Sequence, residues 1–124
     1  MFARPAAKLT LAGTHDRLVD AALDAASRSY APYSKSSSGC AIQTDRQTFA
    51  GSYLENAAFN PSLPPLQSAL VNLVLAGEDF AAIRRVVLVE VNGAAISQRA
   101  ATEAVLAAIA PRARFERFES LRRP

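Results

Sequence analysis

The sequence has very few side chains of the kinds that form disulfide bonds or bind transition metals. It contains one cysteine, Cys40, and one histidine, His15. A single cysteine excludes a disulfide within the chain, and the apolar neighbours of Cys40 indicate a small core residue. A catalytic zinc ion needs three converging nitrogen, sulfur or carboxylate ligands, and the spacing of these two residues offers no such set. We therefore expect a solvent-facing His15, a packed Cys40, and no metal or other cofactor.

Long apolar runs and strong charge are also lacking. No run of about 18 apolar residues occurs, and the first residues lack the apolar stretch of a signal peptide. Basic residues exceed acidic ones only by 14 to 11. Arginines gather near the C-terminus, but interleaved glutamates favour a solvated face over a nucleic-acid surface. These residues are Arg112, Arg114, Arg117, Arg122 and Arg123, with Glu116 and Glu119. We expect a cytoplasmic protein whose partners are neither membranes nor nucleic acids.

Hydrophobic residues make up 50% of the 124-residue chain, which suffices for the core of one domain. Pro5 and Gly13 predict an extended N-terminal arm over residues 1–13, lying against the domain or against a second subunit. We expect residues 14–124 to form the domain. Its first helix should begin at an N-cap on Thr14, because apolar residues then recur at three- and four-residue spacing. Pro32 should end it.

Two short strands at 39–43 and 48–53 predict a hairpin. The helix predicted over 66–76 is apolar on nearly every side, so we expect it to be buried between a sheet and another helix or subunit. Residues 83–91 predict an inner strand, because their apolar centre is nearly continuous. A helix over 98–109 with Ser97 as its N-cap and a last, exposed strand over 114–119 complete the pattern. This order predicts an α/β fold in three α/β/α layers, with a mixed sheet of about five strands between helices.

Several motifs resemble the cytidine deaminases. They are Tyr30-Ala-Pro-Tyr-Ser-Lys35, the strand start Gly39-Cys-Ala41, and Gly51-Ser-Tyr-Leu-Glu-Asn-Ala-Ala-Phe59, and the likeness extends over residues 14–119. The runs Phe59-Asn-Pro-Ser-Leu-Pro-Pro-Leu-Gln67 and Ser97-Gln-Arg99 are most similar to the C-terminal half of two-domain cytidine deaminases, in which a catalytic half is followed by a degenerate copy. The resemblance implies a cytidine-deaminase-like fold.

The resemblance also implies that the metal site of the family is degenerate in this chain. Zinc nucleobase deaminases hold the metal with a His or Cys from an H-x-E segment and two Cys from P-C-x-x-C, while the Glu moves protons. Alignment through the glutamate–asparagine motif places Pro64 at the first ligand and Leu66 at the catalytic glutamate. It places Gln98 and Ala101 at the two thiolates. We therefore expect this chain to lack the zinc ligands and the catalytic residue.

The nucleoside-binding positions implied by the resemblance carry the family's residue at one position and other residues elsewhere. The position that packs on the base is Ser36, and the two that hold the ribose hydroxyls are Tyr53 and Glu55. Only the glutamate matches the family. Glu55 either still accepts hydrogen bonds from a nucleoside or caps the loop over residues 61–65, and we favour the second interpretation because a buried carboxylate needs partners to stay charged.

Three functions remain open at this point. The first is a non-catalytic cytidine-deaminase-like domain that assembles with itself or with a catalytic deaminase half. The others are a zinc-dependent cytidine deaminase and a nucleoside-binding module without chemistry. For assembly, the candidate interface residues are Tyr33, Asn56, Phe59, Leu66 and Leu70. Whether the chain is complete or part of a two-domain deaminase also stays open.

Overall fold

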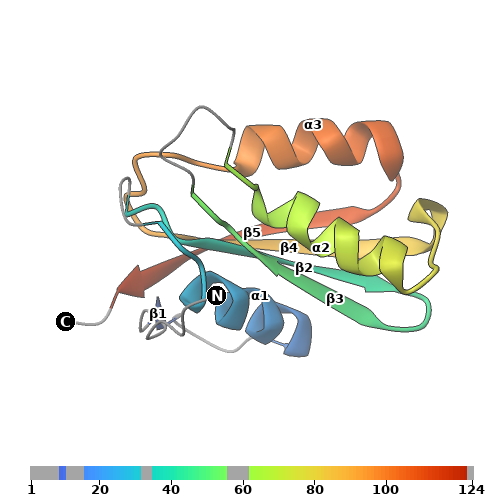
Figure 1. Ribbon diagram of the computed structural model, residues 1–124, viewed down its shortest axis with the longest axis horizontal. Helices are drawn as coiled ribbons and strands as arrows, with labels where there is room; N and C mark the ends of the chain where they lie inside the picture. Colours follow the sequence, from blue (N-terminus) through green and yellow to red (C-terminus); the bar gives the residue numbers. More distant parts are fainter. Residues whose placement is uncertain (1–8, 11–15, 32–34, 56–61, 123–124) are drawn as a thin grey trace.

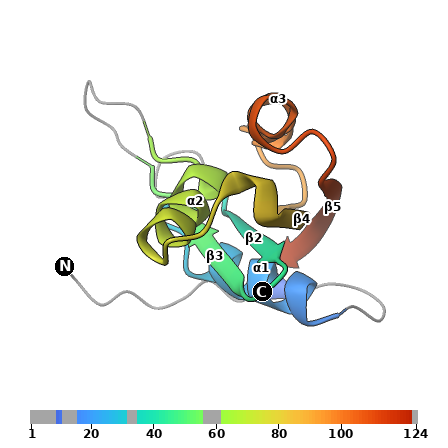
Figure 2. The same cartoon turned by 90° about the vertical axis from the view of Figure 1, so that its right-hand side faces the viewer.

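The computed structural model describes residues 9–10, 16–31, 35–55 and 62–122. They form one sheet with helices on both of its faces (Figures 1 and 2). The elements are β1 (Leu9–Thr10), α1 (Arg17–Ser27), β2 (Ser38–Thr44), β3 (Thr48–Ser52), α2 (Pro65–Leu75), a 3₁₀ turn (Phe80–Ala82), β4 (Ile83–Val91), α3 (Arg99–Ile109) and β5 (Arg114–Arg122). Among the described residues, no helix is long and apolar enough to span a membrane.

The sheet is mixed, in the order β1-β5-β4-β2-β3. β2 pairs antiparallel with β3 and with β4, whereas β4 and β5 are parallel and are joined through α3. This confirms the three-layer fold and the hairpin, and it puts β4 inside the sheet as predicted. In the part of the chain that the structure describes, the predicted last strand over 114–119 has β4 on one side only, because β1 pairs just with Leu121 and Arg122, and the residues of this range are exposed or half-buried.

The N-cap of the first helix lies two residues later in the sequence than predicted. Asp16, not Thr14, is the N-cap of α1, and its Oδ1 accepts a hydrogen bond from the Val19 amide at 3.1 Å. The Arg85 guanidinium donates to Oδ2 at 2.6 Å and so connects the helix start to β4. The Val19 amide and then Arg85 lower the pKa of Asp16, since both stabilise its carboxylate. Thr14 lies outside the described residues.

The two faces of the sheet carry separate cores. On one face, α1 packs Leu18, Val19 and Ala22 on β2 and β4. On the other, α2 and α3 cover β2 to β4, and Figure 2 shows both helices on the side opposite α1. The sheet buries the inner side of α2 as predicted, and the described part of the chain leaves its outer side exposed, so the predicted cover by another helix or subunit stays a prediction. Leu66, Ala69 and Leu73 are fully buried, but Val71, Val74 and Leu75 are 53%, 55% and 80% exposed.

Two glycines let the helices approach the hairpin closely. A Cβ at Gly39 would collide with the Ala26 nitrogen of α1, and one at Gly51 with the Ala69 nitrogen of α2. Gly39 and Gly51 lie on neighbouring strands, where Cys40 pairs with Gly51. The glycines of the two sequence motifs are therefore required by helix–sheet packing.

Candidate functional site

The connection from β3 to α2 is closed at its base by backbone hydrogen bonds. Leu54 and Leu63 exchange two bonds of 3.0 and 2.9 Å, while the Tyr30 amide donates to the Tyr53 carbonyl at 2.8 Å. The Glu55 amide donates back to the Tyr30 carbonyl at 2.7 Å. The two motifs that carry the sequence resemblance thus meet in space beside the start of α2.

The start of α2 offers no polar side chain at the positions predicted to be degenerate. Pro64 is the N-cap, with φ −66° and ψ 154° and no side-chain capping bond, and Pro65 occupies the first helical position. Proline suits this place, since the amide it lacks would have no partner within the helix. Leu66 is fully buried in the core with Cys40 and Ile42.

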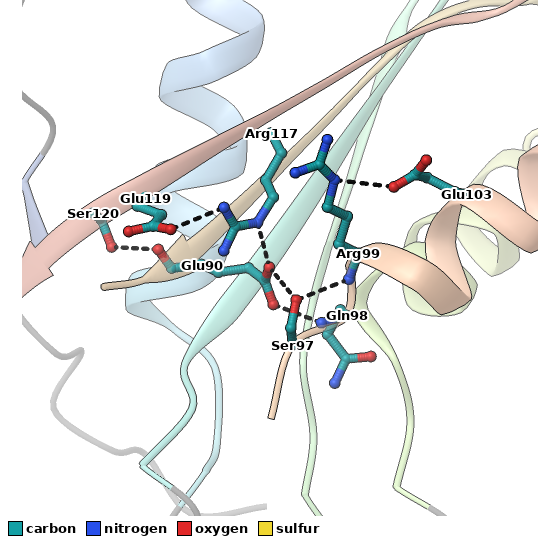
Figure 3. A network of polar contacts seen from close by, with 8 residues as sticks. All are labelled: Glu90, Ser97, Gln98, Arg99, Glu103, Arg117, Glu119 and Ser120. Atoms are coloured by element: carbon teal, nitrogen blue, oxygen red, sulfur yellow. Dashed lines mark hydrogen bonds and ion pairs between the residues drawn. The ribbon is translucent and has the colours of Figure 1, made fainter. Parts of the chain in front are cut away.

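The start of α3 is held by a carboxylate from the sheet (Figure 3). Glu90, near the end of β4, accepts hydrogen bonds from the Gln98 amide at 2.6 Å and the Ser97 hydroxyl at 2.9 Å. Arg117 Nε donates to the same carboxylate at 2.7 Å. The hydrogen bond from Arg117 to Glu90 raises the pKa of Arg117 and keeps it charged.

The helix cap itself differs by one residue from the prediction. Gln98, not Ser97, is the N-cap of α3, and its side chain makes no capping bond. The Ser97 hydroxyl instead accepts from the Arg99 amide at 3.2 Å while it donates to Glu90. Ala101 is exposed, whereas Leu66 is fully buried.

The predicted nucleoside-binding residues are placed as follows. Ser36 is buried, and its hydroxyl accepts from the Ile96 amide at 3.0 Å, which joins the segment before β2 to the segment before α3. Tyr53 is buried and donates its hydroxyl to Glu55 Oε2 at 3.4 Å. The structure therefore brings Tyr53 and Glu55 together.

The interface candidates divide into two groups. Tyr33, Asn56 and Phe59 lie outside the described residues. Leu66 and Leu70 pack in the chain's own core, at 0% and 9% exposure. The accessible apolar atoms of α2 belong instead to Val71, Val74 and Leu75.

Glu90 and Arg117 were not identified as site residues from the sequence. One signal was present, because Glu90 is an acidic residue between Val89 and Val91 in an otherwise apolar inner strand. A charge at such a place needs a buried partner. The pattern did not name that partner, since Arg117 lies 27 residues further along the chain.

The residues present do not fit a zinc ion. Pro64, Leu66 and Ala101 carry no donor atom in their side chains, and no three His, Cys, Asp or Glu residues cluster within the described part of the chain. Cys40 is completely buried, and that burial raises the pKa of its thiol, so the thiolate that zinc requires is disfavoured. His15 lies outside the described residues.

Residues 2–103 match the family model of the cytidine and deoxycytidylate deaminase zinc-binding region. The chain belongs to this family. It is 60% identical over 96 residues to a cytidine deaminase of Sodalis glossinidius, a match covering 77% of this chain and 31% of the relative. It is 56% identical over 97 residues to that of Photorhabdus laumondii, covering 77% and 33%.

Solved cytidine deaminases share the fold. The Burkholderia pseudomallei structure superposes with a TM-score of 0.65 at 29% identity, covering 77% of this chain and 76% of that one. The Mycobacterium leprae structure gives 0.65 at 27% identity, covering 79% and 82%. These matches confirm the family resemblance and the three-layer fold. The chain spans about a third of the length of the curated relatives, which is consistent with a likeness to one half of a two-domain cytidine deaminase.

Proposed function

We propose that this chain is a non-catalytic cytidine-deaminase-like domain that serves in assembly. It pairs with a second deaminase-fold unit, either another copy of itself or a catalytic cytidine deaminase half. The donor set supports the first part, because the family's ligand and acid–base positions carry Pro64, Leu66, Gln98 and Ala101. None of these side chains provides a thiolate, an imidazole or a carboxylate.

The outer face of α2 is the observation that carries the assembly proposal. Val71, Val74 and Leu75 are each more than half exposed, and α2 contains no charged residue. Leu54 and Leu63, at 39% and 38% exposure, add apolar surface in the connection that precedes α2. An uncharged helix with an apolar outer face is stabilised when a partner removes that face from water. A symmetric pairing would place the same face on both partners.

Sedimentation velocity of the purified chain tests this assignment. We expect self-association, or a complex with a separately purified catalytic cytidine deaminase half. Leu75→Glu should weaken either assembly, because it replaces the most exposed apolar side chain of this face with a charge. Ala107→Glu is the matched control, since it adds the same charge at an exposed position of α3. Absence of both self-association and binding to the catalytic half would overturn the proposal.

Family membership favours one other function, zinc-dependent hydrolysis of cytidine or deoxycytidine to uridine or deoxyuridine. Zinc content and the loss of cytidine absorbance at high protein concentration decide between the two. One tightly bound zinc ion per chain together with turnover would replace our proposal with this one.

A binding module without chemistry would use Tyr53 and Glu55, which contact each other. Calorimetry with cytidine and uridine at millimolar concentration tests it, with Glu55→Ala as the comparison. Absence of heat would exclude this function.

We also propose a cytoplasmic location, because a single buried cysteine suits a reducing compartment.

A further inference from the structure

Glu90 is a fully enclosed carboxylate in the inner strand of the sheet. It is 1% exposed and lies between Val89 and Val91, which are 0% and 7% exposed. Taking a carboxylate out of water costs far more than taking out a neutral polar group, unless charged and hydrogen-bonded partners compensate. A residue kept in this position needs a specific set of partners.

The partners of Glu90 come from two other elements (Figure 3). Oε1 accepts from the Ser97 hydroxyl at 2.9 Å and from Arg117 Nε at 2.7 Å, and Oε2 accepts from the Gln98 amide at 2.6 Å. Arg117 is itself held by Glu119 at 3.0 Å. The carboxylate therefore joins the end of β4 to the first residues of α3 and to the middle of β5.

Apart from Glu90, the start of α3 is held by two neutral hydrogen bonds, in which the Arg99 amide donates to the Ser97 hydroxyl and the Ile96 amide donates to Ser36. The Gln98 side chain makes no capping bond, and no acidic residue lies in the first helical turn. The first amides of a helix have no partners within the helix and carry its positive dipole end, so a negative charge placed there is stabilising. Glu90 supplies this charge from the sheet rather than from the helix sequence.

We propose that Glu90 is the anchor that fixes the start of α3 on the sheet, and that this helix start is held without a metal ion. The carboxylate supplies the negative charge and the hydrogen-bond acceptors, and Arg117 compensates its burial. The inference concerns how the domain is held together and does not depend on which partner the outer face of α2 binds.

Two variants with the same chemical change separate this anchor from an ordinary ion pair. Glu90→Gln removes the buried charge and turns a donor toward the Gln98 amide or toward Arg117. Glu103→Gln is the control, because Glu103 is on α3 as well and pairs with Arg99 at 3.0 Å, but with both side chains more than half exposed. Thermal unfolding of the full chain should show a Tm lower by about 8 °C or more for Glu90→Gln and by less than about 3 °C for Glu103→Gln.

Hydrogen exchange provides a local readout that a general loss of stability would not give. In Glu90→Gln, amide exchange should accelerate by about tenfold or more at Gln98, whose amide donates to Glu90, and at Thr102, whose amide donates to the Gln98 carbonyl, while the amides of α1 keep their protection. If Glu90→Gln does not fold, Ser97→Ala removes one donor and leaves the charge in place. It should show the same local acceleration with a smaller Tm shift.

The metal-free part of the proposal is tested on the unaltered chain. Dialysis against a chelator, followed by addition of equimolar zinc chloride, should leave Tm and the exchange at Gln98 and Thr102 unchanged. A Tm that falls on chelation or rises with zinc would overturn the proposal. Equal Tm values for Glu90→Gln and Glu103→Gln would overturn it as well.

Discussion

Gly51 lies beneath the first turns of α2, and one added methyl group there should destabilise the fold by several kcal/mol. A Cβ at this position would collide with the Ala69 nitrogen and would lie 2.6 Å from the Pro65 carbonyl oxygen and 2.8 Å from the Ser68 carbonyl carbon. All three are backbone atoms, so no side chain can rotate away and the helix itself has to move. Overpacking of this kind lowers the free energy of unfolding by about 1–3 kcal/mol and occasionally more. With three backbone collisions, we expect a cost of about 3 kcal/mol for the added methyl group of Gly51→Ala.

Part of that loss is offset, because alanine is favoured over glycine within a strand by about 0.5–1 kcal/mol. We therefore expect Gly51→Ala to lower the free energy of unfolding by at least about 2 kcal/mol. Urea denaturation measures this as a lower midpoint with an unchanged m-value. Gly39→Ala, which collides with the backbone of α1 on the opposite face, should behave in the same way.

Gly77→Ala is the comparison that separates collision from backbone strain. Gly77 has φ +80°, and a Cβ added there would have no atom within 4 Å. Gly77→Ala should therefore lower the free energy of unfolding only by the cost of a left-handed backbone at alanine, about 1–2 kcal/mol. A Gly51→Ala chain as stable as the unaltered one, with α2 in place, would refute the close approach of α2 to β3.

Three further outcomes follow from the exposed helix face, the α1 cap and the buried thiol. At a protein concentration low enough to keep the chain monomeric, Leu75→Glu should change the free energy of unfolding by less than about 0.5 kcal/mol, because Leu75 is 80% exposed, and a larger loss in urea denaturation under that condition would mean that it packs within the chain. Asp16→Ala should lose about 1 kcal/mol of stability at pH 7 through its N-cap bond. Because folding lowers the pKa of Asp16 from its usual 3.8, this contribution is complete above that pH and is lost as the pH falls through the lowered value. Acid titration of both chains should therefore show their stabilities converging, and a difference that does not shrink as the pH falls below 3.8 would contradict the assignment. Cys40 should be inert to iodoacetamide in the native chain and react after unfolding in urea, since burial raises the pKa of its thiol, whereas rapid native labelling would contradict its burial.

The repeating patterns of the sequence predicted most of the fold. Three helices, the hairpin and the inner strand were identified because each has its own periodicity and its own turn residues. The cap of α1 was misplaced because Thr14 and Asp16 both suit an N-cap, and the contact with Arg85 that accompanies Asp16 joins residues 69 positions apart. β1 was not predicted, since its two residues have no pattern of their own and pair only with a finished β5.

The candidate site was predictable only where the family motifs fixed an alignment. That alignment assigned the ligand and acid–base positions to Pro64, Leu66, Gln98 and Ala101, which stays a prediction, and it did not point to the carboxylate that holds the start of α3. The bonds to the Glu90 carboxylate depend on β4, β5 and the start of α3 coming together, and no local spacing in the sequence indicates such an arrangement. The sequence did not indicate that Val71, Val74 and Leu75 lie on the outer side of α2, because hydrophobicity on every side of a helix does not tell which side the sheet covers.

Sedimentation equilibrium of the chain, after dialysis against a chelator, tests the proposed assembly role most directly. We expect an average mass above the 13.2 kDa of one chain, or a stoichiometric complex when a catalytic cytidine deaminase half is added. Either mass should fall toward that of the separate chains for Leu75→Glu and stay high for Ala107→Glu. A mass of 13.2 kDa for the unaltered chain, unchanged by the catalytic half, would contradict the assembly role.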